Sequence, residues 1–156
     1  MQDSFARLEQ GAETKMLSDS LVQFVGRHAE YVARLWLADV RSSRSTAGYR
    51  TLDPLKLLEE GAAGLRLLGG WLEGEGTEED VKTFYRRLGA QRREQGIALH
   101  EMLSALMLMK KQIWVFARSQ GVWERPVDMY RVMELQARFA AFFDKAMYNA
   151  ARGHEG

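Results

Sequence analysis

Apolar side chains recur at steps of three and four residues along most of the chain, and this period constrains the fold more than any other feature. Such steps place the side chains on one face of an α-helix, whereas a half-buried strand needs strict alternation. Between residues 18 and 41, for example, one face would hold Leu21, Val25, His28, Val32 and Leu35. Strand-like alternation is missing throughout. The sequence therefore predicts an all-α protein.

Breaks in this pattern divide the chain into five predicted helices. The stretch 42–48 is rich in serine and glycine and predicts a loop. The two prolines, Pro54 and Pro126, stand where helices should begin. Asp53 and Thr77 are residue types that cap helix N-termini. The predicted helices span residues 18–41, 54–74, 77–95, 98–120 and 126–151.

The helix predicted over 98–120 has apolar residues on more than half of its circumference. We expect it to lie buried at the centre of the bundle. A short link joins it to the last helix, which predicts that these two pack as an antiparallel pair. Gly61 and Gly64 predict that another helix approaches the second helix closely. We expect one helical domain over 17–151, between a flexible N-terminal segment, 1–16, and a flexible tail, 152–156.

The composition argues against several classes of partner. Lys and Arg number 22 against 21 Asp and Glu, so no strong field attracts nucleic acid or an anionic membrane. The chain contains no cysteine, which excludes disulfides and thiolate metal sites. Residues 1–16 carry charges and lack the apolar core of a signal peptide, and no apolar run could span a bilayer. We therefore expect a cytoplasmic protein.

No group of residues predicts catalysis or metal binding. His100 and Glu101 resemble the start of the zinc-protease motif, but position 104, where the second histidine should stand, is Ser104. The sequence contains no Gly-x-Ser-x-Gly turn to carry a nucleophile. The glycines between residues 61 and 70 lie inside a predicted helix and lack the Lys of a phosphate loop. We expect a protein that is not an enzyme and holds no metal.

Two further groups of residues each admit two interpretations. The basic row Lys82, Arg86 and Arg93 is typical of a solvated helix face, and the alternative is a surface for an acidic partner. Methionines of the last two helices are typical core residues, and the alternative is an adaptable ligand pocket. Such a pocket would be lined by residues of the 98–120 helix, namely Met102, Leu106, Met109, Lys110 and Trp114.

Two segments carry a resemblance to a known family. They are DPLKLLEEG, residues 53–61, and RREQGIALHEMLSALMLMKKQIW, residues 92–114. Together with the helical pattern over about 17–150, they resemble the N-terminal sensor domain of RsbR-type stressosome co-antagonists, the RsbRD N-terminal family. The resemblance implies a globin-like fold without haem, a homodimer and a role as the input module of a bacterial stressosome or histidine-kinase pathway. It implies no chemistry and no cofactor.

The globin-like expectation raises a second hypothesis, a haem-based gas sensor. A haem globin needs an axial histidine on the helix before the last long pair, and residues 77–95 contain none. Haem would therefore have to use His28 or His100. A third hypothesis is an adaptor that binds its partner through the basic row. The leading expectation is a haem-free dimer that responds to a small ligand or to a partner protein.

Overall fold

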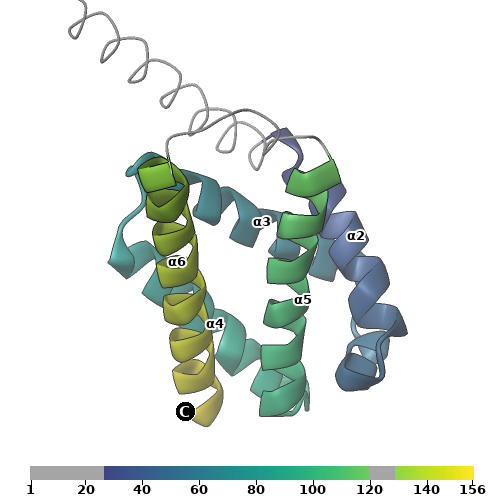
Figure 1. Cartoon of the computed structure of the whole chain (residues 1–156). Helices are drawn as coiled ribbons and strands as arrows, with labels where there is room; N and C mark the ends of the chain where they lie inside the picture. The colour runs from purple at the N-terminus through teal and green to yellow at the C-terminus, as the bar shows by residue number, and fades with distance from the viewer. Residues whose placement is uncertain (1–26, 120–128) are drawn as a thin grey trace, which may run out of the picture.

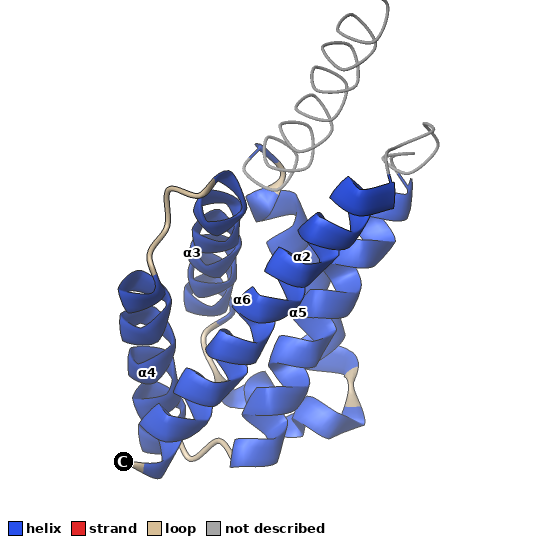
Figure 2. Ribbon diagram, turned by 60° about the vertical axis from the view of Figure 1, so that its left-hand side comes forward, coloured by secondary structure: helices blue, strands red, loops and turns tan. Residues whose placement is uncertain are grey.

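The computed structural model describes residues 27–119 and 129–156, and every regular element in these ranges is helical (Figures 1 and 2). The all-α prediction is confirmed. The predicted flexible segment 1–16, residues 17–26 and the link 120–128 lie outside the described residues. The described elements are α2 (Ala29–Ser42), the 3-10 helix η1 (Arg44–Thr51), α3 (Pro54–Glu73), α4 (Glu78–Glu94), α5 (Leu99–Ser119) and α6 (Met129–Glu155).

The ends of α3 and the start of α4 follow from local capping chemistry. The Asp53 carboxylate accepts a hydrogen bond from the backbone N–H of Leu55 at 3.0 Å, and Pro54 occupies the first turn of α3. Gly74 ends the helix in the left-handed conformation, with φ of 81°, which costs glycine no steric strain. Thr77 and Asp80 form a reciprocal capping box at the start of α4. These contacts confirm the predicted helix starts at Asp53 and Thr77.

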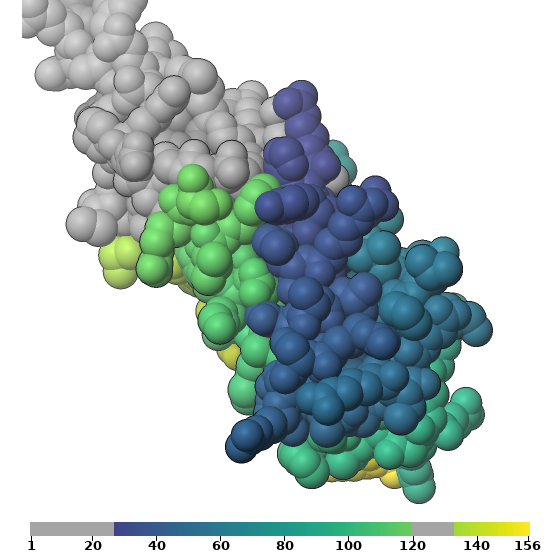
Figure 3. Space-filling view, turned by 90° about the vertical axis from the view of Figure 1, so that its right-hand side faces the viewer, coloured from purple at the N-terminus to yellow at the C-terminus, as the bar shows by residue number. Residues whose placement is uncertain are grey.

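The helices form two groups that share α3. On one side, α2 packs against both α3 and α5, and Figure 3 shows α2 in contact with its neighbours on this face. On the other side, α6 makes its most extensive contact with α4. The segment 42–48, predicted as a loop, lies partly in η1, where the buried Thr46 hydroxyl donates a hydrogen bond to the carbonyl oxygen of Val40 at 2.7 Å. Side-chain hydrogen bonds of this kind favour short tight turns.

Helices α4 and α6 touch through their backbones. A Cβ atom at Gly89 would collide with the carbonyl oxygen of Ala150, and one at Gly153 would collide with that of Arg86. Two glycines, one on each helix, therefore permit a contact that no other residue type would allow. The sequence analysis placed Gly153 in a flexible tail, 152–156. That expectation is wrong for residues 152–155, because α6 continues to Glu155 and packs on α4 over this last turn.

Helices α5 and α6 run antiparallel, as predicted, but they are not each other's main partners (Figure 1). Helix α5 is enclosed over part of its circumference. It buries one face, which includes Met102, Leu106 and Ile113, while Met107 is 56% and Val115 47% exposed. The helix is covered on one side and open on the other. None of the described helices is long and apolar enough to cross a membrane.

Candidate functional site

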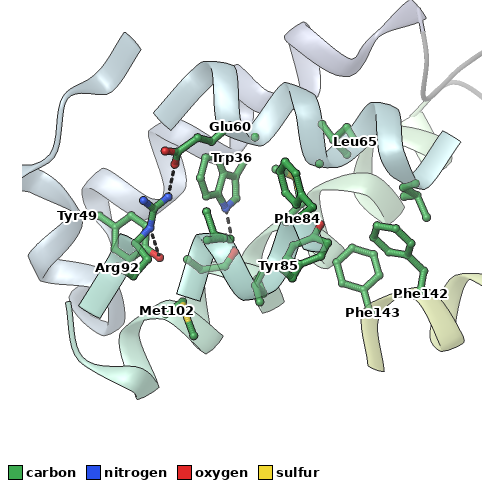
Figure 4. A pocket seen from close by; sticks show the side chains of 17 residues that line it. Trp36, Tyr49, Glu60, Leu65, Phe84, Tyr85, Arg92, Met102, Phe142 and Phe143 are labelled. Carbon is green, nitrogen blue, oxygen red and sulfur yellow. Dashed lines mark hydrogen bonds and ion pairs between the residues drawn. The ribbon is translucent and has the colours of Figure 1, made fainter. Parts of the chain in front are cut away.

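A cavity lies among the helices, and each of the six described elements contributes to its wall (Figure 4). Its volume is about 40 Å³, counted over the positions that the centre of a water molecule can occupy. That is roughly three times what a single water needs. One residue from each element in chain order illustrates how the wall is assembled: Trp36, Tyr49, Leu65, Tyr85, Met102 and Phe142.

A buried cation lies at one end of the cavity. Arg92 is only 2% exposed and forms an ion pair with Glu60. Its Nε–H donates a hydrogen bond to the Tyr49 hydroxyl at 3.3 Å, and another guanidinium nitrogen donates to Gln95 at 3.0 Å. Burial raises the pKa of Tyr49, although the positive charge of Arg92 and its hydrogen bond act in the opposite direction. This end of the cavity is therefore polar, but its charges already compensate each other.

Aromatic rings form the opposite end (Figure 4). The rings of Phe84 and Tyr85 meet edge to face with centroids 4.9 Å apart, and Tyr85 meets Phe142 in the same way at 5.9 Å. Phe143 continues the series, with its centroid 5.4 Å from that of Phe142. Edge-to-face pairs at these separations are favourable, so the wall is well packed.

Tyr85 places its hydroxyl at the border of the cavity. The residue is 5% exposed, and burial raises the pKa of its phenol well above the usual value. Its oxygen lies 3.1 Å from the position that a Cβ atom would take on Gly64, another lining residue. In the part of the chain that the structure describes, the Tyr85 hydroxyl makes no hydrogen bond with protein. Tyr85 is thus a neutral polar group inside an aromatic wall.

Trp36 forms the middle of the wall and is fixed in position from two sides. Its indole N–H donates a hydrogen bond to the backbone oxygen of Ala105 at 2.8 Å, across from α2 to α5. Its ring lies flush on α3, because a Cβ atom on Gly61 would be only 3.0 Å from two ring carbons. At Gly61 and Gly64, where the sequence predicts the close approach of another helix, the near neighbours are side chains: the indole of Trp36 at the first and the Tyr85 hydroxyl at the second.

The five residues of the pocket predicted from the sequence lie in different places relative to this cavity. Met102, Leu106 and Met109 line it, whereas Lys110 and Trp114 do not. The Trp114 ring packs instead against Phe139 of α6, with centroids 4.7 Å apart. Lys110 is half-buried outside the cavity, and its neighbour Lys111 is exposed. Most of the other side chains that line the cavity come from other elements, which the pattern of a single helix could not indicate.

Most of the predicted basic row is engaged within the chain. Arg86 donates a hydrogen bond from Nε to the amide oxygen of Asn149 at 3.1 Å. Arg93 donates to the backbone oxygen of Glu155 at 2.8 Å. Lys82 is half-buried. Two of the three cations therefore fasten α4 to α6.

The structure keeps the histidines well apart. His28 is exposed just before α2, and its ring centroid lies 5.3 Å from that of Phe116 near the end of α5. His100 is exposed in the first turn of α5, about 24 Å away along the helix axis at 1.5 Å per residue. His154 donates a hydrogen bond from Nε2 to the backbone oxygen of Ile97 at 2.7 Å. Within the described residues, no three groups of metal-binding type converge.

Arg92, Glu60 and Tyr49 form the polar end of the cavity, and none of them belongs to a site that the sequence predicts. One signal could have found Arg92. Val81, Tyr85, Leu88 and Arg92 follow one another at steps of four, three and four, so the arginine stands on the apolar stripe of its helix. Glu60 and Tyr49 carry no comparable signal, because they are recruited from separate elements.

Comparison with known proteins gives one finding. The sequence profile of the family described as the RsbT co-antagonist protein rsbRD N-terminal domain matches residues 30–155. No curated protein and no solved structure matches the chain significantly. The matched range includes every residue that lines the cavity. With four-fifths of its length matched and a fold made of helices alone, the chain belongs to the rsbRD N-terminal domain family.

Proposed function

We propose that this chain is a haem-free sensory domain of a bacterial stress-signalling system, which acts as a dimer and responds to an occupant of its cavity. Membership of the rsbRD N-terminal family carries the proposal, because domains of this family are regulatory. On this proposal the chain has no catalytic activity and works in the cytoplasm. Its partner is a stressosome component or a histidine kinase, and it binds no nucleic acid.

The cavity supplies a route from ligand to helix movement. Phe142 and Phe143 of α6 line the same space as residues of α2, α3 and α5. A ligand there would press on α6 and on α5 together. Small shifts of packed helices are a common way for proteins to pass a signal to an interface. The proposal therefore links the interior of the bundle to its outer helix faces.

The open face of α5 supports the dimer. Met107 and Val115 are exposed apolar residues eight positions apart, so they lie two turns apart on the same side of the helix. Exposed apolar side chains grouped on one face favour association. We propose that a second copy of the chain covers this face.

Sedimentation equilibrium tests the dimer. The wild-type chain should have twice the mass of one copy, and Val115→Glu should be monomeric because it places a charge in the contact. Leu55→Glu is the matched control, since Leu55 is 71% exposed on α3, away from this face. A wild-type monomer at high concentration would refute the dimer.

The signalling role needs a test in the bacterium that carries the gene. We expect deletion of the gene to change the induction of stress-response genes after a sublethal stress. Wild-type protein should restore the response, while Val115→Glu should not restore it. An unchanged response in the deletion strain would contradict the signalling role, whatever the outcome of the sedimentation experiment.

A further inference from the structure

We propose that the cavity binds a small neutral aromatic molecule with a single hydroxyl group, whose ring lies among the aromatic side chains and whose hydroxyl bonds to that of Tyr85. This inference deepens the proposed function and rests on it only for biological meaning, since binding itself can be measured on the isolated chain. Four observations support it: charge compensation, the nature of the wall, the hydroxyl of Tyr85 and the size of the space.

The ligand should be neutral because the cavity offers no uncompensated charge. Arg92 is the one cation among the lining residues, and Glu60, Gln95 and Tyr49 already occupy its guanidinium. An anionic ligand would have to displace Glu60 and leave that carboxylate beside it. A cationic ligand would lie near Arg92. Both arrangements would bury a poorly compensated charge at high cost.

The wall favours a ring over a plain alkyl chain. Trp36, Phe84, Tyr85, Phe142 and Phe143 all contribute to it, and they present both edges and faces. Aromatic pairs gain energy beyond the area that they bury when edges meet faces. Two methionines, Met102 and Met109, complete the wall. Their flexible side chains can adapt to the outline of a ligand and make favourable contacts with its ring.

The Tyr85 hydroxyl indicates where the polar group of the ligand lies. It makes no hydrogen bond with protein among the described residues, although the residue is 5% exposed and lines the cavity. Among the described residues no buried side-chain oxygen lacks a partner, so this oxygen is accessible from the cavity, and a ligand that forms a hydrogen bond with it gains affinity.

The cavity volume sets the size of the ligand. A space of about 40 Å³ for the centres of water molecules holds roughly three waters, or about half a dozen non-hydrogen atoms. Phenol has this size and the required chemistry, and benzene is the same ring without the hydroxyl. This pair of probes separates the contribution of the ring from that of the hydrogen bond.

Isothermal titration calorimetry with phenol and benzene tests the proposal. Phenol should bind the wild type with a dissociation constant in the millimolar range or tighter, and benzene about fivefold more weakly. Tyr85→Phe keeps the ring and removes the hydroxyl. It should weaken phenol binding about fivefold and leave benzene binding unchanged within about twofold. The control Tyr148→Phe changes a tyrosine that is 63% exposed on α6, and it should change neither affinity.

Gly64→Ala gives a second measurement that does not depend on Tyr85→Phe. The new methyl group would lie 3.1 Å from the Tyr85 oxygen and would cover it, so phenol binding should weaken about as much as in Tyr85→Phe. Gly70→Ala is its matched control on the same helix, because the nearest atom to its new methyl group is 3.9 Å away.

Phenol should also shift the methyl resonances of Met102 and Met109 in an NMR spectrum, but not that of the exposed Met107.

Either of two outcomes would overturn the inference. One is that neither probe binds or shifts the cavity methionines. The other is that phenol and benzene bind equally and Tyr85→Phe makes no difference. Failure of the proposed function is a separate result: phenol then binds as described, yet the deletion strain shows a normal stress response.

Discussion

At the scale of single residues, the ion pair of Arg92 and Glu60 shows how the interior tolerates a charge. Arg92 is almost fully buried, whereas the Glu60 side chain is 24% exposed. Taking a guanidinium out of water is expensive unless its N–H groups all find acceptors. Here three groups accept hydrogen bonds from it: the Tyr49 hydroxyl of η1, the Glu60 carboxylate of α3 and the amide oxygen of Gln95, which follows α4. The pair links η1, α3 and α4 at the polar end of the cavity.

Removal of Glu60 should therefore destabilise the protein more than removal of a surface partner. We expect Glu60→Ala to lower the free energy of unfolding by about 2 kcal/mol, because Arg92 would keep its buried charge without a counterion, and partial exposure of Glu60 limits the loss. The comparison is Glu30→Ala, which breaks an ion pair with Arg34 whose side chains are more than 60% exposed. Urea denaturation should show about 0.5 kcal/mol or less for that variant. Equal effects of the two substitutions would contradict this account.

At the scale of elements, α4 combines three structural roles. Its first turn is fixed by the capping box, its apolar stripe reaches the cavity, and its glycine receives the backbone of α6. Helix α6 provides the matching partner surface. Arg86 and Arg93, whose spacing suggested a solvated face, donate hydrogen bonds across this contact. Backbone proximity and polar side chains therefore both hold α4 and α6 together.

The close contact at Gly89 predicts that alanine substitutions at two glycines, Gly89 and Gly70, change the free energy of unfolding in opposite directions. Gly89→Ala should lower the free energy of unfolding by about 3 kcal/mol, since its methyl group would meet backbone atoms of α6 that cannot rotate away. Gly70→Ala lies inside α3 with room for a methyl group, and it should raise the free energy of unfolding by about 0.5 kcal/mol. Chemical denaturation of both variants provides the measurement. A neutral Gly89→Ala would show that the helices separate easily.

The capping box of α4 predicts a dependence of stability on pH. The hydrogen bond from the Thr77 hydroxyl, and then that from its backbone N–H, hold the pKa of Asp80 below its usual value. A carboxyl with a lowered native pKa stabilises the fold above about pH 4, and the contribution is lost as the pH falls through the native pKa. Asp80→Asn should thus be less stable than the wild type at pH 7, with the difference shrinking by pH 2.

Thermal denaturation followed by circular dichroism, repeated across this pH range, provides the comparison. Glu79→Gln is the control, because Glu79 occupies the same first turn but takes no part in the capping box. If the Asp80→Asn difference stayed constant from pH 7 to pH 2, the carboxylate would not be its source.

At the scale of the whole molecule, the end of α6 closes the structure against the turn between α4 and α5. His154 donates a hydrogen bond to the carbonyl oxygen of Ile97, and Arg93 donates to that of Glu155. Gly153 lets this last turn approach Arg86. In Figures 1 and 2, the C-terminal turn of α6 lies beside α4. The last turn of α6 therefore covers the end of the bundle where α4 leads into α5.

Truncation after Ala151 tests whether this closure stabilises the fold. The shortened chain should lose about 2 kcal/mol, from two hydrogen bonds to partners that stay partly buried. Its Tm should fall by about 5 °C. Deletion of Gly156 alone keeps His154 and Glu155 and should leave the Tm unchanged. A truncated chain as stable as the full one would restore the earlier expectation of a flexible tail.

The sequence by itself determined the all-α fold class, two helix starts and three of the residues that line the cavity. Helix starts at Asp53 and Thr77 were predictable because capping is local: donor and acceptor are at most three residues apart. Three cavity residues, Met102, Leu106 and Met109, followed from the period of one helix.

Only the tertiary structure decided which helices pair and what the cavity contains. The short link between α5 and α6 predicted that these two pack as an antiparallel pair, but the most extensive contact joins α4 and α6, whose backbones meet at Gly89 and Gly153. Arg92 stands on the apolar stripe of α4, and only the fold brings Tyr49 and Glu60 beside it. The physical reason is the same in each case. A helical period tells which side of a helix avoids water, but the partner of that side is chosen by shape and by hydrogen bonds between distant segments.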